Sequence, residues 1–285
     1  MWYDKLIFHR PTTKAEALAV LDQQPAHLLA GGTDLLVNLK NVARQPARQT
    51  DSPTHFVNIA DLIELQQIVI DGQKLTIGAG VTFSQYLRQA DQVLPPLTEA
   101  IVGLAAPSIR NRATFGGNII NASPAADTLP VLYALDAELV LESASTTRLV
   151  TITDFITGPK QTILRPEELL TAVRLTIPHN YKHHYRKIGT RKALALSKVA
   201  FLGLYLPDTK EIRLTYGSVG PTVIRAYEAE RLFLAGQIDS IPDCIERTVK
   251  PIDDQRSTAE YRRFLCRMLT DEFLNICQSS PTPLS

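Results

Sequence analysis

The residues with the clearest chemical potential lie in one stretch, 113–129, which reads ATFGGNIINASPAADTL. Thr114 places a hydroxyl beside the pair Gly116 and Gly117, and amide side chains and the carboxylate of Asp127 follow. Because glycine has no Cβ, two in succession allow a positive φ and let a ligand approach the backbone. Consecutive free N–H groups in such a turn form an anion site. We therefore interpret the stretch as a glycine-hinged turn, a short strand and a polar loop, suited to a long ligand with phosphates and a polyol.

A second stretch, 28–36, reads LLAGGTDLL and has the same chemistry. It predicts a strand, a tight turn and a helix start, with Thr33 or Asp34 as the N-cap. Exposed N–H groups at a helix start attract phosphate, so the two turns together could hold a pyrophosphate. Neither turn fits the spacing G-x-G-x-x-G or G-x-x-x-x-G-K-[ST], so Rossmann and P-loop interpretations lack support. The alternative, that each glycine pair only forms a tight turn, stays open at this point.

Composition excludes several classes of protein. The chain has 285 residues, of which 45% are hydrophobic and 21% charged, with 30 basic and 29 acidic residues. This is ordinary globular composition, and the near-zero net charge favours neither nucleic acid nor an anionic membrane. No apolar run approaches the ~20 residues of a membrane span. We expect neither a nucleic-acid partner nor a membrane span.

Cysteine and histidine usage argues against a metal centre in this chain. Cys244, Cys266 and Cys277 lie far apart without C-x-x-C spacing, which indicates reduced thiols, a cytoplasmic location and no four-cysteine iron–sulfur site. His183 and His184 are adjacent and would point to opposite faces of a strand. No G-x-S-x-G or H-E-x-x-H motif is present, so we predict no catalytic residue and expect a cofactor to carry the chemistry.

Periodicity predicts an α+β fold, because strands, helices and turns alternate too irregularly for a doubly wound sheet. Helices are expected over about 13–22, 82–90 and 128–135, and the strand at 169–177 ends before Pro178. The polar stretch 178–184 is interpreted as a linker. Beyond it, three strands over 185–188, 199–206 and 213–218 predict a three-stranded antiparallel sheet, followed by helices over about 226–234 and 258–277.

Five stretches resemble the FAD-binding subunit or domain of the molybdenum hydroxylases, a family that includes xanthine dehydrogenase and the medium subunit of aerobic carbon monoxide dehydrogenase. They are AGGTD (30–34), KLTIGAGVTFSQY (74–86), IRNRATFGGNIINASPAADTLPVLYALDA (109–137), RKIGTRKALALSKVA (186–200) and PIDDQRSTAEYRRFL (251–265). The resemblance therefore covers nearly the whole chain in the family's order.

The resemblance implies a two-lobed FAD-binding domain of the molybdopterin-dehydrogenase type, which is vanillyl-alcohol-oxidase-like. This domain would span residues 1–177, with lobes over about 1–55 and 56–177. A smaller C-terminal flavoprotein domain would span residues 178–285 and contain the three-stranded sheet and the last helices.

Carried over position by position, the resemblance also assigns residues to a non-covalent FAD. The cofactor-binding residues implied are Leu29, Ala30, Gly31, Gly32, Thr33, Asp34, Thr114, Phe115, Gly116, Gly117, Asn118, Asp127, Leu169 and Lys187. Asp127 would accept from a ribityl or ribose hydroxyl, and Lys187 would lie near the pyrimidine edge of the flavin unless it is a solvated strand lysine. Arg110 and Arg112 could neutralise phosphate or brace the loop through carbonyl groups, and we favour bracing.

The implied function is electron transfer within a molybdenum hydroxylase, most closely a xanthine dehydrogenase. Electrons would reach this FAD from [2Fe–2S] clusters on a small partner subunit and leave to NAD⁺ or another acceptor. The molybdenum cofactor would reside on a large partner subunit, in a dimer of heterotrimers. Three alternatives stay open. They are a stand-alone flavin oxidase or reductase, the FAD subunit of a carbon monoxide, nicotinate or aldehyde dehydrogenase, and a non-catalytic nucleotide-binding or assembly module that has lost flavin.

Overall fold

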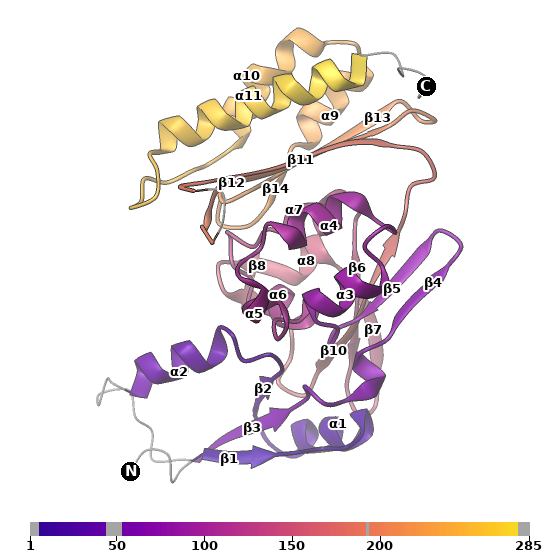
Figure 1. The fold of residues 1–285 in the computed structure, drawn as a ribbon, viewed down its shortest axis with the longest axis vertical. Coiled ribbons are helices and arrows are strands. Elements are labelled where there is room, and N and C mark those ends of the chain that lie inside the picture. The colour runs from indigo at the N-terminus through magenta and orange to yellow at the C-terminus, as the bar shows by residue number, and fades with distance from the viewer. Residues whose placement is uncertain (1–5, 44–52, 192–193, 279–285) are drawn as a thin grey trace. The chain divides into compact units, whose positions relative to one another are not determined.

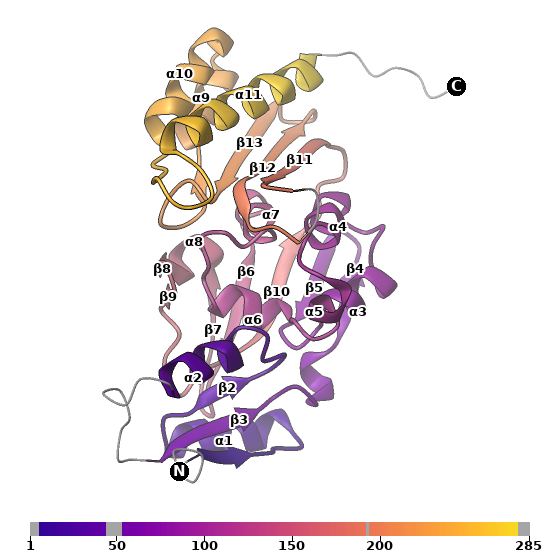
Figure 2. The ribbon, with the colours of Figure 1, turned by 60° about the vertical axis from the view of Figure 1, so that its left-hand side comes forward.

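The computed structural model describes residues 6–43, 53–191 and 194–278, and Figures 1 and 2 show the fold from two directions. The chain divides into two compact units, and neither is a single continuous segment. Unit 1 comprises Met1–Asp91, Ala106–Asn121 and Glu138–Leu175, and unit 2 comprises Gln92–Ala105, Ala122–Ala137 and Thr176–Ser285. The mixture of helices and largely separate antiparallel sheets confirms the α+β class. The predicted limit between residues 177 and 178 stays a prediction.

Unit 1 begins with a parallel sheet of three strands in the order β1-β3-β2. The strands are β1 (Leu6–His9), β2 (His27–Leu29) and β3 (Thr54–Asn58), and the helices α1 (Lys14–Gln23) and α2 (Leu35–Ala43) lie between them in sequence. The predicted helix over about 13–22 is α1, and its apolar face carries Leu18 and Leu21, which pack against Val57 of β3. Thr13 caps α1, because its side chain accepts a hydrogen bond from the Glu16 N–H at 3.2 Å.

A second sheet of unit 1 has the strand order β4-β5-β10-β6-β7. Its strands are β4 (Ile68–Asp71), β5 (Lys74–Gly78), β6 (Glu138–Glu142), β7 (Thr147–Thr151) and β10 (Leu169–Thr176). The remaining elements of unit 1 are η3 (Ile63–Leu65), α3 (Phe83–Gln89), α5 (Pro107–Arg110), α6 (Phe115–Ile120), α8 (Ile152–Phe155), and the hairpin β8 (Ile156–Gly158) and β9 (Gln161–Thr162). Thr82 caps α3, because its hydroxyl accepts a hydrogen bond from the Gln85 N–H at 3.1 Å.

The principal glycine stretch does not lead into a strand, and this prediction was wrong. Residues Phe115–Ile120 form the helix α6, whose N-cap is Thr114. The threonine hydroxyl accepts a hydrogen bond from the Gly117 N–H at 3.1 Å, which fixes the first turn. Helix geometry also keeps φ negative at Gly116 and Gly117, so their positive φ was wrongly expected as well. A strong cap outweighs the low helix propensity of glycine here.

The sheet of unit 2 has four antiparallel strands in the order β11-β12-β13-β14, one more than predicted. The strands are β11 (Lys182–Gly189), β12 (Ser197–Leu206), β13 (Glu211–Gly217) and β14 (Ile224–Arg225). The additional strand β14 has only two residues and therefore gives no alternation that a sequence could reveal. Strand β11 also begins within the predicted linker, because Lys182 pairs with Tyr205 of β12.

Helices cover both faces of this sheet within unit 2 (Figure 2). The helices are α4 (Pro95–Val102), α7 (Leu129–Ala134), α9 (Tyr227–Leu234), η4 (Ile238–Ser240), α10 (Ile241–Thr248) and α11 (Ala259–Gln278). Successive side chains of β13 point to opposite faces of the sheet and so meet different helices. The Thr215 hydroxyl donates to the Pro130 carbonyl in α7, and the Tyr216 hydroxyl contacts Thr270 of α11 at 2.6 Å. At Gly203, a Cβ would lie 2.4 Å from the Phe273 ring of α11, so only glycine permits this approach.

Candidate functional site

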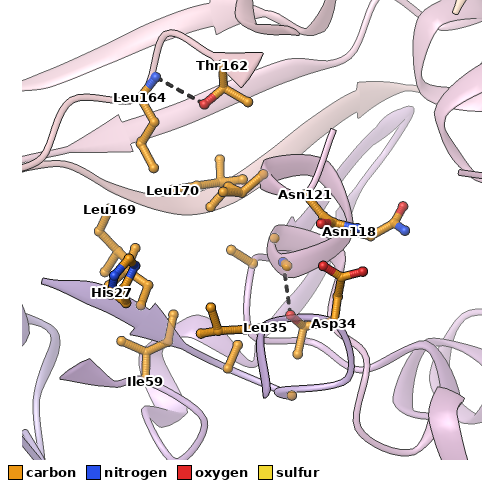
Figure 3. Close-up of a pocket in the computed structure, with 18 of the residues that line it drawn as sticks. His27, Asp34, Leu35, Ile59, Asn118, Asn121, Thr162, Leu164, Leu169 and Leu170 are labelled. Carbon is orange, nitrogen blue, oxygen red and sulfur yellow. Dashed lines mark hydrogen bonds between the residues drawn. The ribbon is translucent and has the colours of Figure 1, made fainter. Parts of the chain in front are cut away.

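A cavity of about 620 Å³ in unit 1 brings the two glycine stretches together. Although 28–36 and 113–121 are far apart in sequence, both contribute to its wall. The predicted residues that line it are Ala30, Gly31, Gly32, Thr33, Asp34, Thr114, Gly116, Gly117, Asn118 and Leu169. Figure 3 shows Asp34, Asn118 and Asn121 on one side of the cavity and apolar side chains on the other. The cavity thus offers a polar part and an apolar part to one elongated ligand.

The first glycine turn presents backbone N–H groups to the cavity. Gly32 has a φ of +71°, a conformation that glycine adopts without steric cost. Gly31 is required for a different reason, since a Cβ there would lie 1.9 Å from the Arg112 carbonyl oxygen. Among the described residues, no hydrogen bond takes the backbone N–H groups of Gly31, Gly32, Thr33 or Asp34. Free donors immediately before α2 are suited to phosphate oxygens.

The second glycine stretch lacks the free N–H groups that the sequence suggested. The Phe115 N–H donates to the Val81 carbonyl at 3.1 Å, and the Gly116 N–H donates to the Ala79 carbonyl at 2.8 Å. A Cβ at Gly116 would lie 2.7 Å from the Ala79 Cβ, so this glycine permits packing of α6 beside β5. At Gly117, a Cβ would meet only the Thr114 hydroxyl, at 3.0 Å, and would otherwise enter the cavity. The stretch therefore lines the cavity without side-chain bulk at its glycines, and it does not form the anion site of consecutive free N–H groups.

The apolar part of the cavity is built from three different elements. Leu35 begins α2, Ile59 follows β3, and Leu169 and Leu170 begin β10. Figure 3 shows these side chains around the end of the cavity that also contains His27. Leu169 is fully buried and packs in the core cluster beneath the first sheet, so its backbone position is fixed. Such a surface is suited to a flat ring system, which needs to be shielded from water.

Four residues assigned to the cofactor do not line the cavity, and two of them, Leu29 and Phe115, belong to unit 1. Leu29 belongs to β2, and its carbonyl accepts from the Ile59 N–H at 2.9 Å. Phe115 is buried and its ring packs edge-on against Phe83 at 5.0 Å between centroids. The sequence neighbours of both residues line the cavity, but Leu29 and Phe115 themselves do not. The bracing role favoured for Arg112 agrees with the structure, since its Nε donates to the Gly31 carbonyl at 3.2 Å.

Asp127 and Lys187, the other two predicted residues, form a buried ion pair in unit 2. The Lys187 ammonium donates to the Asp127 carboxylate at 2.6 Å and to the Gly103 carbonyl at 2.9 Å. The Ser197 hydroxyl donates to the other Asp127 oxygen. Lys187 is therefore not a solvated strand lysine: its side chain is 15% exposed, against 7% for that of Asp127. This cluster also shows Ser197 as a partner that the sequence did not identify.

Burial dominates the electrostatics of this cluster. It raises the pKa of the Asp127 carboxyl above its usual value, although the ammonium of Lys187 and the Ser197 hydroxyl oppose this shift. Burial also raises the pKa of Tyr185, whose hydroxyl donates to the Asp127 carbonyl at 3.2 Å. The pair is thus held by hydrogen bonds as well as by charge, and Asp127 keeps lone pairs that can accept from a further hydroxyl group.

Lys160 and Glu168 are charged residues of the cavity wall that sequence reasoning missed. Lys160 lies at the tip of the β8–β9 hairpin, and its ammonium contacts the Asp34 carboxylate at 3.3 Å and the side-chain oxygen of Asn121. Glu168 accepts two hydrogen bonds from Arg148, at 2.6 and 2.8 Å. The Pro159–Lys160 turn was visible in the sequence, but nothing there indicated which segments it would approach.

The described residues contain no group of three or more His, Cys, Asp or Glu side chains in a metal-binding arrangement. The two neighbouring histidines contact different carboxylates, since His183 is 2.8 Å from Glu99 and His184 is 3.0 Å from Glu272. In the part of the chain that is described, no helix has the length and apolar character needed to cross a bilayer.

Two family descriptions together match nearly the whole chain. Residues 4–179 match the FAD binding domain in molybdopterin dehydrogenase. Residues 181–276 match the CO dehydrogenase flavoprotein C-terminal domain.

Individual relatives match over most of their length. The chain is 32% identical over 290 residues to the xanthine dehydrogenase FAD-binding subunit of Escherichia coli O157:H7, and this match covers 96% of each chain. It is 31% identical over 270 residues to the carbon monoxide dehydrogenase medium chain of Afipia carboxidovorans, and this match covers 90% of each chain. Among solved structures, a chain of reconstituted CO dehydrogenase from Oligotropha carboxidovorans has a TM-score of 0.83 at 27% identity, over 94% of this chain and 95% of that one.

Proposed function

Because the chain belongs to the family of FAD-binding subunits of the molybdenum hydroxylases, we propose that it holds one FAD non-covalently and passes electrons from iron–sulfur clusters on a partner subunit to NAD⁺ or another acceptor. FAD, when bound, supplies the redox chemistry, since it can accept and release electrons singly or in pairs. The chain itself supplies binding, orientation and exclusion of water. No side chain of this subunit is assigned a catalytic role.

The observation that carries this proposal is that the cavity in unit 1 has a polar part and an apolar part. The free N–H groups of residues 31–34 are donors for the diphosphate, and the absence of a Cβ at Gly117 leaves the opposite wall open to the cofactor. Leu35 and Leu169 offer apolar surface to the flavin ring. Asp127 and Lys187 remain proposed contacts of the ribityl chain and the pyrimidine edge of the flavin.

Among the enzymes of this family, we favour a xanthine dehydrogenase type. Its support is the 32% identity to a xanthine dehydrogenase FAD-binding subunit along 96% of the chain. The FAD subunit of a carbon monoxide, nicotinate or aldehyde dehydrogenase is the alternative, because a carbon monoxide dehydrogenase medium chain is 31% identical. A stand-alone flavin oxidase or reductase is a third possibility. The large partner subunit separates these cases, since it would select the substrate.

The partners proposed are a large molybdopterin-binding subunit and a small [2Fe–2S] subunit, assembled as a dimer of heterotrimers. The names of the relatives describe subunits and medium chains, which supports a multi-subunit enzyme. We place the complex in the cytoplasm. The three free cysteines, two of them buried, are consistent with a reducing compartment.

The experiment is to express the chain alone and together with its partner subunits, and to load both preparations with FAD. Each is then assayed with hypoxanthine, nicotinate, carbon monoxide and an aldehyde, with NAD⁺ or a dye as acceptor. We expect substrate oxidation only in the complex, with hypoxanthine as the preferred substrate. The chain alone should bind FAD and exchange electrons between NADH and a dye.

Two results would contradict parts of this proposal. Substrate-dependent reduction of the flavin in the chain alone would support the stand-alone oxidase instead. A complex that oxidises nicotinate, carbon monoxide or an aldehyde, and not hypoxanthine, would leave the subunit role intact but contradict the xanthine dehydrogenase assignment.

A further inference from the structure

We propose that Lys160 is the cation that binds the diphosphate of the cofactor, held in position between the two glycine stretches by Asp34 and Asn121. This inference rests on the proposed function, because it assumes that the cavity of unit 1 takes FAD. Lys160 lines the cavity, and its ammonium is 3.3 Å from the Asp34 carboxylate. It also donates to the side-chain oxygen of Asn121, at the C-terminal end of α6.

The charges around the cavity favour Lys160 for this role. A diphosphate carries negative charge, and the free N–H groups of residues 31–34 offer only dipoles to it. Asp34, which follows these N–H groups, would repel phosphate if it were unpaired, and Lys160 is its ion-pair partner. The other cationic side chain of the wall, Arg165, lies beside Glu168 at 4.0 Å. Of these two lining cations, Lys160 is the one that contacts a residue of the first glycine turn, Asp34.

Stability of the fold does not account for a lysine at this position. The side chains of Lys160 and Asp34 are 51% and 48% exposed, and ion pairs as exposed as this add little to stability. The backbone conformation of Lys160 also gives no stability reason for a lysine here. Lys160 has a φ of +60° in the two-residue turn between Gly158 and Gln161, a conformation that glycine adopts at lower cost. A side chain kept at a strained position beside a cavity suggests a functional reason.

The chain offers a matched control for this strained lysine. Lys210 also has a positive φ, +57°, and lies in the turn between β12 and β13 of unit 2. It is exposed and does not line the cavity. Replacing either lysine with glycine therefore removes the same side chain from the same backbone conformation, and only Lys160→Gly removes charge from the cavity.

The test compares the wild type, Lys160→Gly, Lys160→Arg and Lys210→Gly as full chains. Affinities for FAD, and for riboflavin as the analogue without phosphate, are measured by quenching of flavin fluorescence at low and high salt. We expect Lys160→Gly to lower the affinity for FAD about tenfold to a hundredfold at low salt, because one charge-assisted hydrogen bond is lost. The loss should shrink at high salt. Riboflavin affinity should not change, and Lys160→Arg and Lys210→Gly should bind FAD like the wild type.

Thermal unfolding of the unliganded proteins separates binding from structure. Both glycine variants should unfold at the wild-type temperature or slightly above it, because backbone strain is relieved. Three results would overturn the assignment of Lys160: unchanged FAD affinity in Lys160→Gly, an equal loss of riboflavin affinity, or a lower unfolding temperature for Lys160→Gly alone. A wild-type chain that binds neither flavin would instead contradict the proposed function itself.

Discussion

At the scale of single residues, the four glycines of the two stretches act in different ways. Gly32 adopts a positive φ, Gly31 and Gly116 permit close packing, and Gly117 leaves space open in the cavity. A substitution therefore tests ligand binding only where it disturbs neither the backbone nor the packing. Among these four positions, Gly117 meets that condition best.

We predict that Gly117→Val folds normally but binds FAD at least about a hundredfold more weakly than the wild type. Valine has a better helix propensity than glycine, and its Cβ would contact only the Thr114 hydroxyl. The measurement is flavin content after reconstitution, together with far-ultraviolet circular dichroism. Gly31→Ala is the contrast, because its Cβ would strike the Arg112 carbonyl and should lower stability. A folded Gly117→Val protein with full flavin content would show that this wall does not face the cofactor.

Asp127 is expected to contribute to folding as well as to binding. An asparagine at this position can still accept a hydrogen bond from Lys187, but it no longer gives the buried ammonium an opposite charge, which costs about 3 kcal/mol. We therefore predict that Asp127→Asn lowers the free energy of unfolding in urea by about that amount and also lowers the affinity for FAD. The double variant Asp127→Asn/Lys187→Met should recover part of the stability. If Asp127→Asn unfolds like the wild type, the pair has no structural role.

At the scale of elements, the cavity depends on how short segments are tied to the sheets. The segment that leads into β10 is held by Glu168, which accepts hydrogen bonds from Arg148 of β7 and from the backbone N–H of Arg165 at 2.9 Å. Burial would raise the pKa of Glu168, but these donors outweigh it and hold the pKa below the ordinary value of 4.5. The ionised glutamate thus stabilises the wall that contains Leu169.

This shift predicts a pH dependence of stability. A carboxyl whose folded-state pKa is lowered stabilises the protein above its unfolded-state pKa, and that stabilisation is lost as the pH falls through the folded-state value. We predict that Glu168→Gln is less stable than the wild type at neutral pH and that the difference shrinks below about pH 4.5. Chemical denaturation at several pH values provides the measurement, with Glu167→Gln as the neighbouring control. A difference that does not depend on pH would mean that Glu168 acts through packing alone.

At the scale of the whole molecule, the residues that we propose as cofactor contacts belong to both units. The cavity belongs to unit 1, and the Asp127–Lys187 pair belongs to unit 2. Each unit has its own sheets and its own apolar core. FAD bound by such a subunit would be held by many weak contacts and not by a bond to the chain.

We predict that heat or acid denaturation of the complete complex releases FAD into the supernatant, with about one FAD per copy of this chain. Neither glycine stretch contains a His or Cys that could form a bond to the flavin. Chromatography and absorbance of the supernatant would measure it. Flavin that remains with the precipitate would contradict non-covalent binding and would point to His27, a histidine of the cavity wall.

The sequence by itself determined the features that are set by neighbouring residues. The threonine caps at Thr13 and Thr82, the apolar face of α1, and the glycine turn at residues 31–34 all follow from local chemistry. The family followed as well, because its motifs are contiguous in the chain. These features are encoded within a few residues of one another, so no long-range contact had to be known.

Only the tertiary structure decided which of these features meet. The N–H groups of Phe115 and Gly116 look free in sequence, but Val81 and Ala79 accept from them across unit 1. Strand β14 and the partner Ser197 of Asp127 were likewise invisible, since pairing between distant segments creates them. Lys160 approaches Asp34 over 126 positions of sequence separation because the β8–β9 hairpin reaches the first glycine turn. Contacts of this kind depend on how sheets and helices pack, and no local pattern of residues specifies them.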